Sequence, residues 1–220
     1  MKWKSVIPAL VITIGLLGTT LGFTPSASAE ESGTTTIKLD VISVEVPYTE
    51  PSYSFNRIET PTEVKVEVLN EVKEVVDAYG EIKELSSSNS KPTLFAAAAN
   101  RTVLAYRELV TNGFVANRLY SSLVVRTIPG SSFAQIQSVN ETYWTPSNSD
   151  GTWTLEERHA YTTPVTGSYP TWQVSVTGTA VVDTVRTEYG GVQLGKIGWS
   201  QTSDGHYRKL IELTFSYSTL

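Results

Sequence analysis

The strongest constraint on the fold is a segment over residues 172–182 in which apolar and polar side chains alternate. The apolar or small positions are Trp172, Val174, Val176, Gly178, Ala180 and Val182, and the polar positions are Gln173, Ser175, Thr177 and Thr179. A period of two residues in a run rich in Val and Thr is typical of a β-strand with one buried and one solvated face. The segment therefore predicts a strand whose apolar face, Trp172 included, packs on a core.

Further strand-like runs lie on both sides of this segment, and turn signals separate them. Asn112-Gly113 is the strongest signal, because both central residues of a tight hairpin turn need positive φ. The runs cover residues 102–110, 114–127, 133–144, 152–160, 172–182, 192–200 and 206–218. No helical periodicity occurs among them, so we predict a mainly β fold, an antiparallel β-sandwich or open barrel of about seven strands.

The chain before this β region has a different character. Residues 30–99 contain thirteen acidic and six basic residues, whereas residues 100–220 contain nine of each. Short strands are expected between Ile37 and Val46. Apolar residues then recur at spacings of three and four, which predicts an amphipathic acidic helix over Val68–Tyr79. The alternation of valines over residues 64–68 keeps a strand open as the alternative for the beginning of this run.

Composition suggests where the chain divides. Residues 86–92 are rich in Ser, and residues 96–99 are all Ala, as in a flexible linker. We therefore expect a leader over residues 1–29, an acidic segment over residues 30–85, a Ser/Ala-rich linker over residues 86–99 and an antiparallel β domain over residues 100–220.

The first 29 residues have the features of a secretory signal peptide. Lys2 and Lys4 precede an apolar run over residues 6–21, and Ala27-Ser28-Ala29 has the small-x-small pattern of a cleavage site. We expect cleavage after Ala29 and a secreted, extracellular protein with no stable membrane anchor. The length of the apolar run is typical of Gram-positive bacteria.

Composition also disfavours several classes of chemistry. The absence of Cys excludes thiol catalysis and Cys-ligated zinc, and the only two histidines, His159 and His206, lack the spacing of metal-ligand motifs. The chain has no G-x-S-x-G nucleophile motif. Its net charge of −5 and the lack of a Lys/Arg cluster disfavour nucleic acid. We expect no cofactor, no metal site and no nucleic-acid partner.

Aromatic residues are the candidates for binding. Trp153 directly follows a turn, and Tyr169 and Trp172 flank Pro170, so these side chains, together with Tyr161, could present exposed rings to a sugar. Strands also favour Trp and Tyr for core packing, which is the alternative for each of them. We take Trp153, Tyr161, Tyr169 and Trp172 as the candidate ligand-binding residues.

Carboxylates offer a weaker candidate site. Glycoside hydrolysis needs two carboxyl groups on opposite sides of the scissile bond. Adjacent residues of a strand point to opposite faces, so Glu156 and Glu157 are not expected to form the pair together. One of them would have to meet Asp204, which a hairpin turn also explains.

Three hypotheses follow, and none of them rests on a sequence motif that specifies a reaction. We favour a secreted, non-enzymatic binding module that acts at the cell surface on a cell-wall or other glycan, or on a surface protein. The second is a precursor whose acidic segment is removed to release a β domain with antimicrobial, inhibitory or toxin-like activity. The third is an extracellular hydrolase that uses Glu156 or Glu157 with Asp204.

Overall fold

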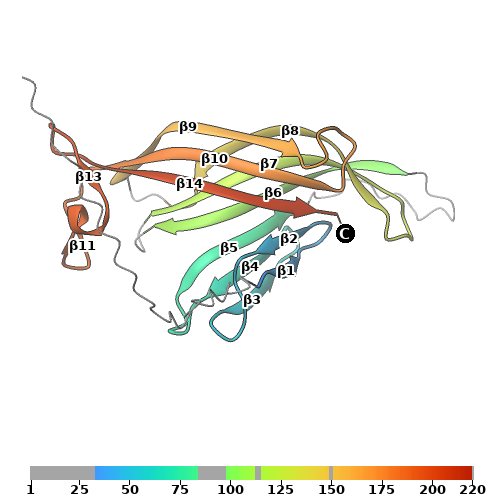
Figure 1. The fold of residues 1–220 in the computed structure, drawn as a ribbon, viewed down its shortest axis with the longest axis horizontal. Coiled ribbons are helices and arrows are strands. Elements are labelled where there is room, and N and C mark those ends of the chain that lie inside the picture. The colour runs from blue at the N-terminus through green and yellow to red at the C-terminus, as the bar shows by residue number, and fades with distance from the viewer. Residues whose placement is uncertain (1–32, 84–97, 112–114, 149–150, 220) are drawn as a thin grey trace, which may run out of the picture. The chain divides into compact units, whose positions relative to one another are not determined.

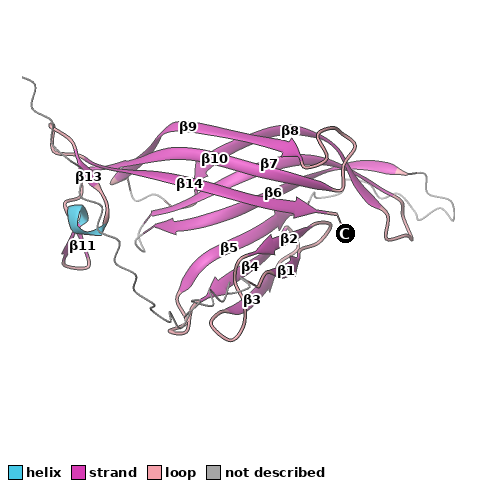
Figure 2. Cartoon of the chain, in the orientation of Figure 1, coloured by secondary structure: helices cyan, strands magenta, loops and turns pink. Residues whose placement is uncertain are grey.

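The computed structural model describes residues 33–83, 98–111, 115–148 and 151–219. These residues are mainly β, and every strand pairing among them is antiparallel, as predicted (Figures 1 and 2). The only helix in this part of the chain is the short 3₁₀ turn η1, Leu194–Ile197. No helix within the described ranges is long and apolar enough to cross a membrane.

Two sheets contain most of the strands. Sheet A has the order β1-β2-β14-β10-β9, with β13 paired to β14, and sheet B has the order β3-β4-β5-β6-β7-β8. Sheet A consists of β1 (Thr35–Lys38), β2 (Ser43–Val46), β9 (Trp153–Pro164), β10 (Gln173–Thr184), β13 (Ser200–Gln201) and β14 (Tyr207–Ser218). Sheet B consists of β3 (Ser54–Glu59), β4 (Glu63–Leu69), β5 (Val75–Ile82), β6 (Ala99–Thr111), β7 (Val115–Thr127) and β8 (Ala134–Pro146). A small separate hairpin is formed by β11 (Glu188–Tyr189) and β12 (Val192–Gln193).

The predicted helix over Val68–Tyr79 is wrong. Strands β4 and β5 occupy this region, and β4 alternates between buried valines and half-buried polar residues. Asn70 forms the turn between them, since its side-chain oxygen accepts hydrogen bonds from the N–H groups of Val72 and Glu74. The β-branched valines, this turn and the pairing of β5 with β6 outweigh the helical spacing.

The predicted strand over residues 192–200 is wrong in extent. Val192 and Gln193 form β12, and the next four residues form η1. Gly198 ends this turn with φ 85, a left-handed conformation that Gly adopts readily. The chain then returns to sheet A as β13.

One hydrophobic core lies between the inner faces of the two sheets. Strand β2 of the acidic segment pairs with the C-terminal strand β14, and β5 pairs with β6. Valines of β2 and β4 are buried in the same core as the apolar residues of β10 and β14. The change of charge near residue 99 is therefore a change of composition within one core, and most of the predicted linker lies outside the described residues.

The two sheets meet closely at Gly178 on β10. A Cβ built on this residue would lie 2.7 Å from both Leu119 Cδ2 on β7 and Trp144 Nε1 on β8. The Trp144 indole is fixed there, because its Nε1 donates to the carbonyl of His159 at 3.2 Å. The alternating segment thus has Gly where its inner face meets Leu119 and Trp144 of sheet B.

A buried ion pair lies at another contact between the sheets. Asp77 on β5 is fully buried, and Arg107 on β6 donates to it from Nη2 at 2.6 Å and from Nε at 3.0 Å. Arg107 Nη1 donates across to the carbonyl of Thr214 in sheet A at 3.3 Å. The hydroxyls of Tyr48 and Tyr79 also donate to Asp77, each at 3.0 Å, and burial raises the pKa of Tyr48 to about 12.

We predict that Gly178→Ala lowers the free energy of unfolding by about 1–3 kcal/mol, because the added methyl overpacks the contact with Leu119 and Trp144. Gly195→Ala is the matched control, since its Cβ would meet Tyr207 at an ordinary 3.8 Å. Denaturant unfolding of the two variants measures the difference. Equal stabilities would contradict the close approach at Gly178.

We predict that Arg107→Met costs about 3–5 kcal/mol of stability, because it leaves the Asp77 carboxylate buried without its cation. The double variant Arg107→Met/Asp77→Leu should be more stable than the single variant, since it removes both charges together. Chemical denaturation of the three proteins gives the comparison. If the double variant is less stable than Arg107→Met, the unpaired Asp77 carboxylate is not the cause of the instability of the single variant.

Candidate functional site

The outer face of sheet A carries rows of short hydroxyl side chains. Burial of the alternate positions of β10 and β14 in the core turns the intervening polar positions to this face. We call the following exposed or half-buried residues the hydroxyl face: Thr163 on β9, Ser175, Thr177 and Thr179 on β10, and Thr214, Ser216 and Ser218 on β14. Register aligns them across the strands, so that Thr177 pairs with Thr214 and Ser175 with Ser216. Alternation in the sequence predicted the β10 row, and strand register places it beside the row on β14.

Tyr161 is the exposed aromatic residue beside the middle of this face. It pairs with Thr177, and 57% of its surface is exposed. Its neighbour Thr162 points to the opposite side, where its hydroxyl lies 2.8 Å from that of Ser121 and 2.7 Å from that of Thr142. These inward contacts fix β9 so that Tyr161 faces outward.

Trp172 lies at one end of the hydroxyl face and is 40% exposed, which corrects the prediction that it belongs to the buried set. The strand begins one residue later, at Gln173. Thr171 causes the offset: its backbone bridges to Ile136, and its hydroxyl donates to the carbonyl of Gln173 at 2.9 Å. The indole packs against Phe133 at a T-shaped angle, with ring centroids 5.4 Å apart.

A hollow of about 360 Å³ adjoins Trp172. Its lining combines an apolar side chain with hydroxyl, amide and carboxylate groups: Thr36, Glu45, Val165, Thr166, Gln173, Ser216 and Ser218. We call it the Trp172 hollow. It offers an exposed ring beside groups that both donate and accept hydrogen bonds.

The other two aromatic candidates are not on this face. Trp153 is 4% exposed and belongs to the core, where it pairs with Thr184 at the end of β10. Tyr169 is half-buried and packs against the core, with its hydroxyl buried. Of the four predicted ligand-binding residues, Tyr161 and Trp172 therefore lie at the same face, and Trp153 and Tyr169 do not.

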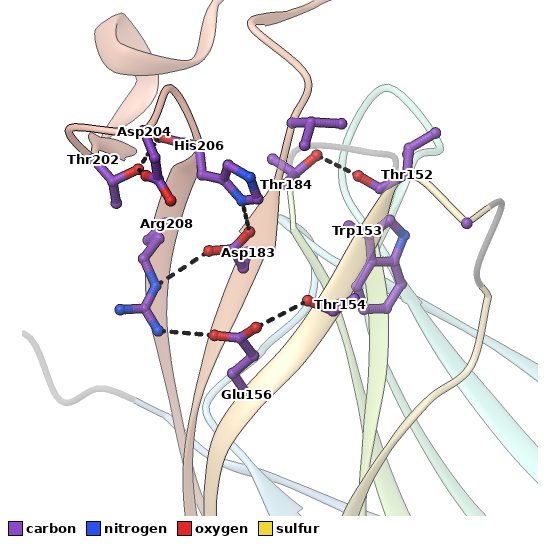
Figure 3. Close-up of a pocket in the computed structure, with 12 residues that line it drawn as sticks. Thr152, Trp153, Thr154, Glu156, Asp183, Thr184, Thr202, Asp204, His206 and Arg208 are labelled. Atoms are coloured by element: carbon purple, nitrogen blue, oxygen red, sulfur yellow. Dashed lines mark hydrogen bonds and ion pairs between the residues drawn. The ribbon is translucent and has the colours of Figure 1, made fainter.

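A second depression, the Asp183 groove, lies at the opposite end of β10 and β14 (Figure 3). Its volume is about 520 Å³. Its lining is Gly151, Thr152, Trp153, Thr154, Glu156, Asp183, Thr184, Val185, Thr202, Asp204, His206 and Arg208. Strand register places Thr154, Asp183 and Arg208 in one row across β9, β10 and β14. Sequence reasoning missed Asp183 and Arg208, because that register was not known.

Charged side chains from three strands converge in the groove. Asp183 Oδ1 lies 2.6 Å from Nδ1 of His206, and Asp183 Oδ2 lies 3.3 Å from Nε of Arg208. Nη2 of Arg208 also donates to Glu156 at 3.1 Å and to Glu157 at 2.8 Å. The hydrogen bond that His206 donates to the Asp183 carboxylate raises the pKa of His206 above its ordinary value.

A β-bulge explains how adjacent glutamates reach the same guanidinium, which corrects the expectation that they point to opposite faces. The register of β9 against β10 shifts between Thr179 and Val181, and Glu157 has φ 47 there. An extra residue in a bulge re-aims the side chains around it. Glu156 and Glu157 thus share Arg208, and Asp204 accepts a hydrogen bond from Thr202 in the β13–β14 turn.

The carboxylates of the hydrolase hypothesis therefore already have partners within the chain. The described residues contain no group of three or more His, Asp or Glu side chains that could hold a metal ion. The predicted cleavage site at Ala29 lies outside the described residues. The groups of this region can donate and accept hydrogen bonds along an exposed β surface.

We predict that Asp183→Asn returns the pKa of His206 toward its ordinary value of 6.5, because the hydrogen bond to the carboxylate is what raises it. In the wild type, the stabilisation from this pair should be complete below the ordinary pKa and should be lost as the pH rises through the raised one. NMR titration of the His206 ring measures the shift, with Glu212→Gln as a control on the same face. An unchanged titration in Asp183→Asn would contradict the pairing.

Comparison of the chain with protein-family models, with curated proteins and with solved structures found no match. The function is therefore inferred from the fold and from the arrangement of side chains.

Proposed function

We propose that the protein is a secreted, non-enzymatic binding module for a glycan, and that the outer face of sheet A is its binding surface. The observation that carries the proposal is the hydroxyl face with two exposed aromatic residues, Tyr161 and Trp172, at its margins. An aromatic ring stacks on the apolar face of a sugar ring, and Ser and Thr hydroxyls both donate to and accept from sugar hydroxyls. This combination suits a neutral, polyhydroxylated ligand.

The physical cost of such binding is low on this face. Ser and Thr are short, and five of the seven residues of the hydroxyl face are already half-buried, so little side-chain entropy is lost when they bind. The hydroxyls of Thr177 and Thr214 lie 3.4 Å apart, so two strands present neighbouring groups to one ligand. The inner faces of the two sheets share one core, which favours the expected sandwich over an open barrel as the scaffold.

The predicted signal peptide supports an extracellular place of action. A cell-wall glycan is a ligand that the protein would meet there. A cysteine-free chain folds without disulfides in that setting if its core is large enough, and this core draws on both sheets. The precursor hypothesis receives no support from the fold. Removal of residues 30–99 would take β1 to β5 away from the core and uncover β6 and β14.

The test is a pull-down of purified residues 30–220 with isolated Gram-positive cell walls and with insoluble polysaccharides. We predict that Tyr161→Ser and Trp172→Ser each weaken binding about tenfold, corresponding to about 1.4 kcal/mol. Tyr189→Ser, at a tyrosine 38% exposed on the separate β11–β12 hairpin, is the matched control and should bind as the wild type does.

Thermal melting of each variant separates loss of binding from loss of fold. Wild-type protein that binds none of the polysaccharides or walls would refute the proposed function. Equal losses in all three folded variants would refute the assignment of the site to this face.

A further inference from the structure

We infer that the ligand is an extended, ribbon-like polysaccharide that lies parallel to β10 and spans about six sugar rings; this inference rests on the proposed function. The dimensions of the outer face of sheet A, and the places at which apolar side chains are exposed along it, support this length and direction.

The face is long and narrow. Its outward positions on β10 run from Gln173, at the Trp172 hollow, to Asp183, in the Asp183 groove. Ten residue steps at about 3.3 Å each give a length of roughly 33 Å. Across the face, the long strands β14, β10 and β9 span two steps of about 4.8 Å, or roughly 10 Å. A linear ligand can therefore contact the whole face only if it runs along the strands.

Exposed apolar side chains occur at three places along this length. Trp172 lies at one end, and Tyr161 lies beside Thr177, five residues further along β10, or about 17 Å away. Leu210 on β14 is 66% exposed and pairs with Val181, a further four residues or about 13 Å along. Hydroxyls occupy the interval between Trp172 and Tyr161, and the row between Tyr161 and Leu210 consists of Thr179 with its paired residues His159 and Glu212.

The succession of apolar and polar side chains along the face matches the chemistry of an extended polysaccharide. Such a chain presents apolar ring faces and hydroxyl edges along its whole length. Each ring adds roughly 5 Å, as single bonds near 1.5 Å dictate, so about six rings cover the face. A coiled polymer would meet the straight rows of Thr and Ser only at intervals.

The Asp183 groove forms a charged end of the outer face of sheet A. Val181 and Leu210 form the last apolar step, and the next outward row consists of Thr154, Asp183 and Arg208. Glu156, 48% exposed at its side chain, and His206, 40% exposed, lie beside that row. Charged groups form stronger hydrogen bonds with sugar hydroxyls than neutral ones do, so this end can hold the terminal rings of the bound segment.

The experiment measures affinity against chain length by calorimetry. The probes are β-1,4-linked oligosaccharides of glucose, of xylose and of N-acetylglucosamine, each from two to eight rings. The α-1,4-linked glucose series, which coils, is the matched control. We expect at least one β-1,4 series to bind with an affinity that rises about 100-fold from two rings to six and then levels off.

Variants locate the two ends of the bound chain. Trp172→Ser and Leu210→Ser should each lower the affinity for six rings about tenfold, while Tyr189→Ser leaves it unchanged. Because Leu210 is a surface residue, its substitution should not alter the melting temperature.

Three outcomes would overturn the inference, and they differ in what remains. If two rings bind as tightly as six, the site is a single pocket, and the proposed glycan function stands. If the wild type binds polysaccharide in the pull-down but no β-1,4 series of any length, or binds the coiled series equally, the extended ligand is refuted alone. If it binds no polysaccharide at all, the proposed function fails first.

Discussion

The buried pair of Arg107 and Asp77 is a polar contact that links the two sheets beside their shared core. Arg107 spans from the carboxylate on β5 to the carbonyl of Thr214 in sheet A, and Tyr48, which follows β2, donates to the same carboxylate. The ion pair is therefore in contact with residues of both the acidic segment and the C-terminal strand. A buried carboxylate is costly without these partners, so the pair restricts how β5, β6 and β14 can be arranged.

Formation of one core also determines which side chains remain available for binding. Trp144, Trp153 and Trp199 fill the space between the sheets, whereas Tyr161 and Trp172 lie at positions that the core does not use. The same alternation that buries the valines of β10 exposes its hydroxyls. The proposed glycan surface is thus the other face of the strand pattern that builds the fold, and it needs no separate domain.

Two local departures from regular strand geometry shape the ends of this surface. Thr171 delays the start of β10 by one residue and leaves Trp172 outside the core. The bulge at Glu157 turns both glutamates toward Arg208 and shapes the charged end of the face. Bulges and irregular strand ends commonly re-aim side chains near binding sites, and here they act at opposite ends of the same two strands.

The sequence by itself determined the mainly β character, most of the long strands after residue 100 and the row of hydroxyls on β10, because each follows from alternation and turn residues that are local in the chain. It misassigned residues 68–79, because spacing alone suits a helix, and the pairing of β5 with β6 lies outside any local window. Only the tertiary structure decided which aromatics are exposed and that Asp183, Arg208 and Glu156 converge. Strand register brings Arg208 to Glu156, 52 positions away in the chain, and a one-residue shift changes the face that every side chain occupies.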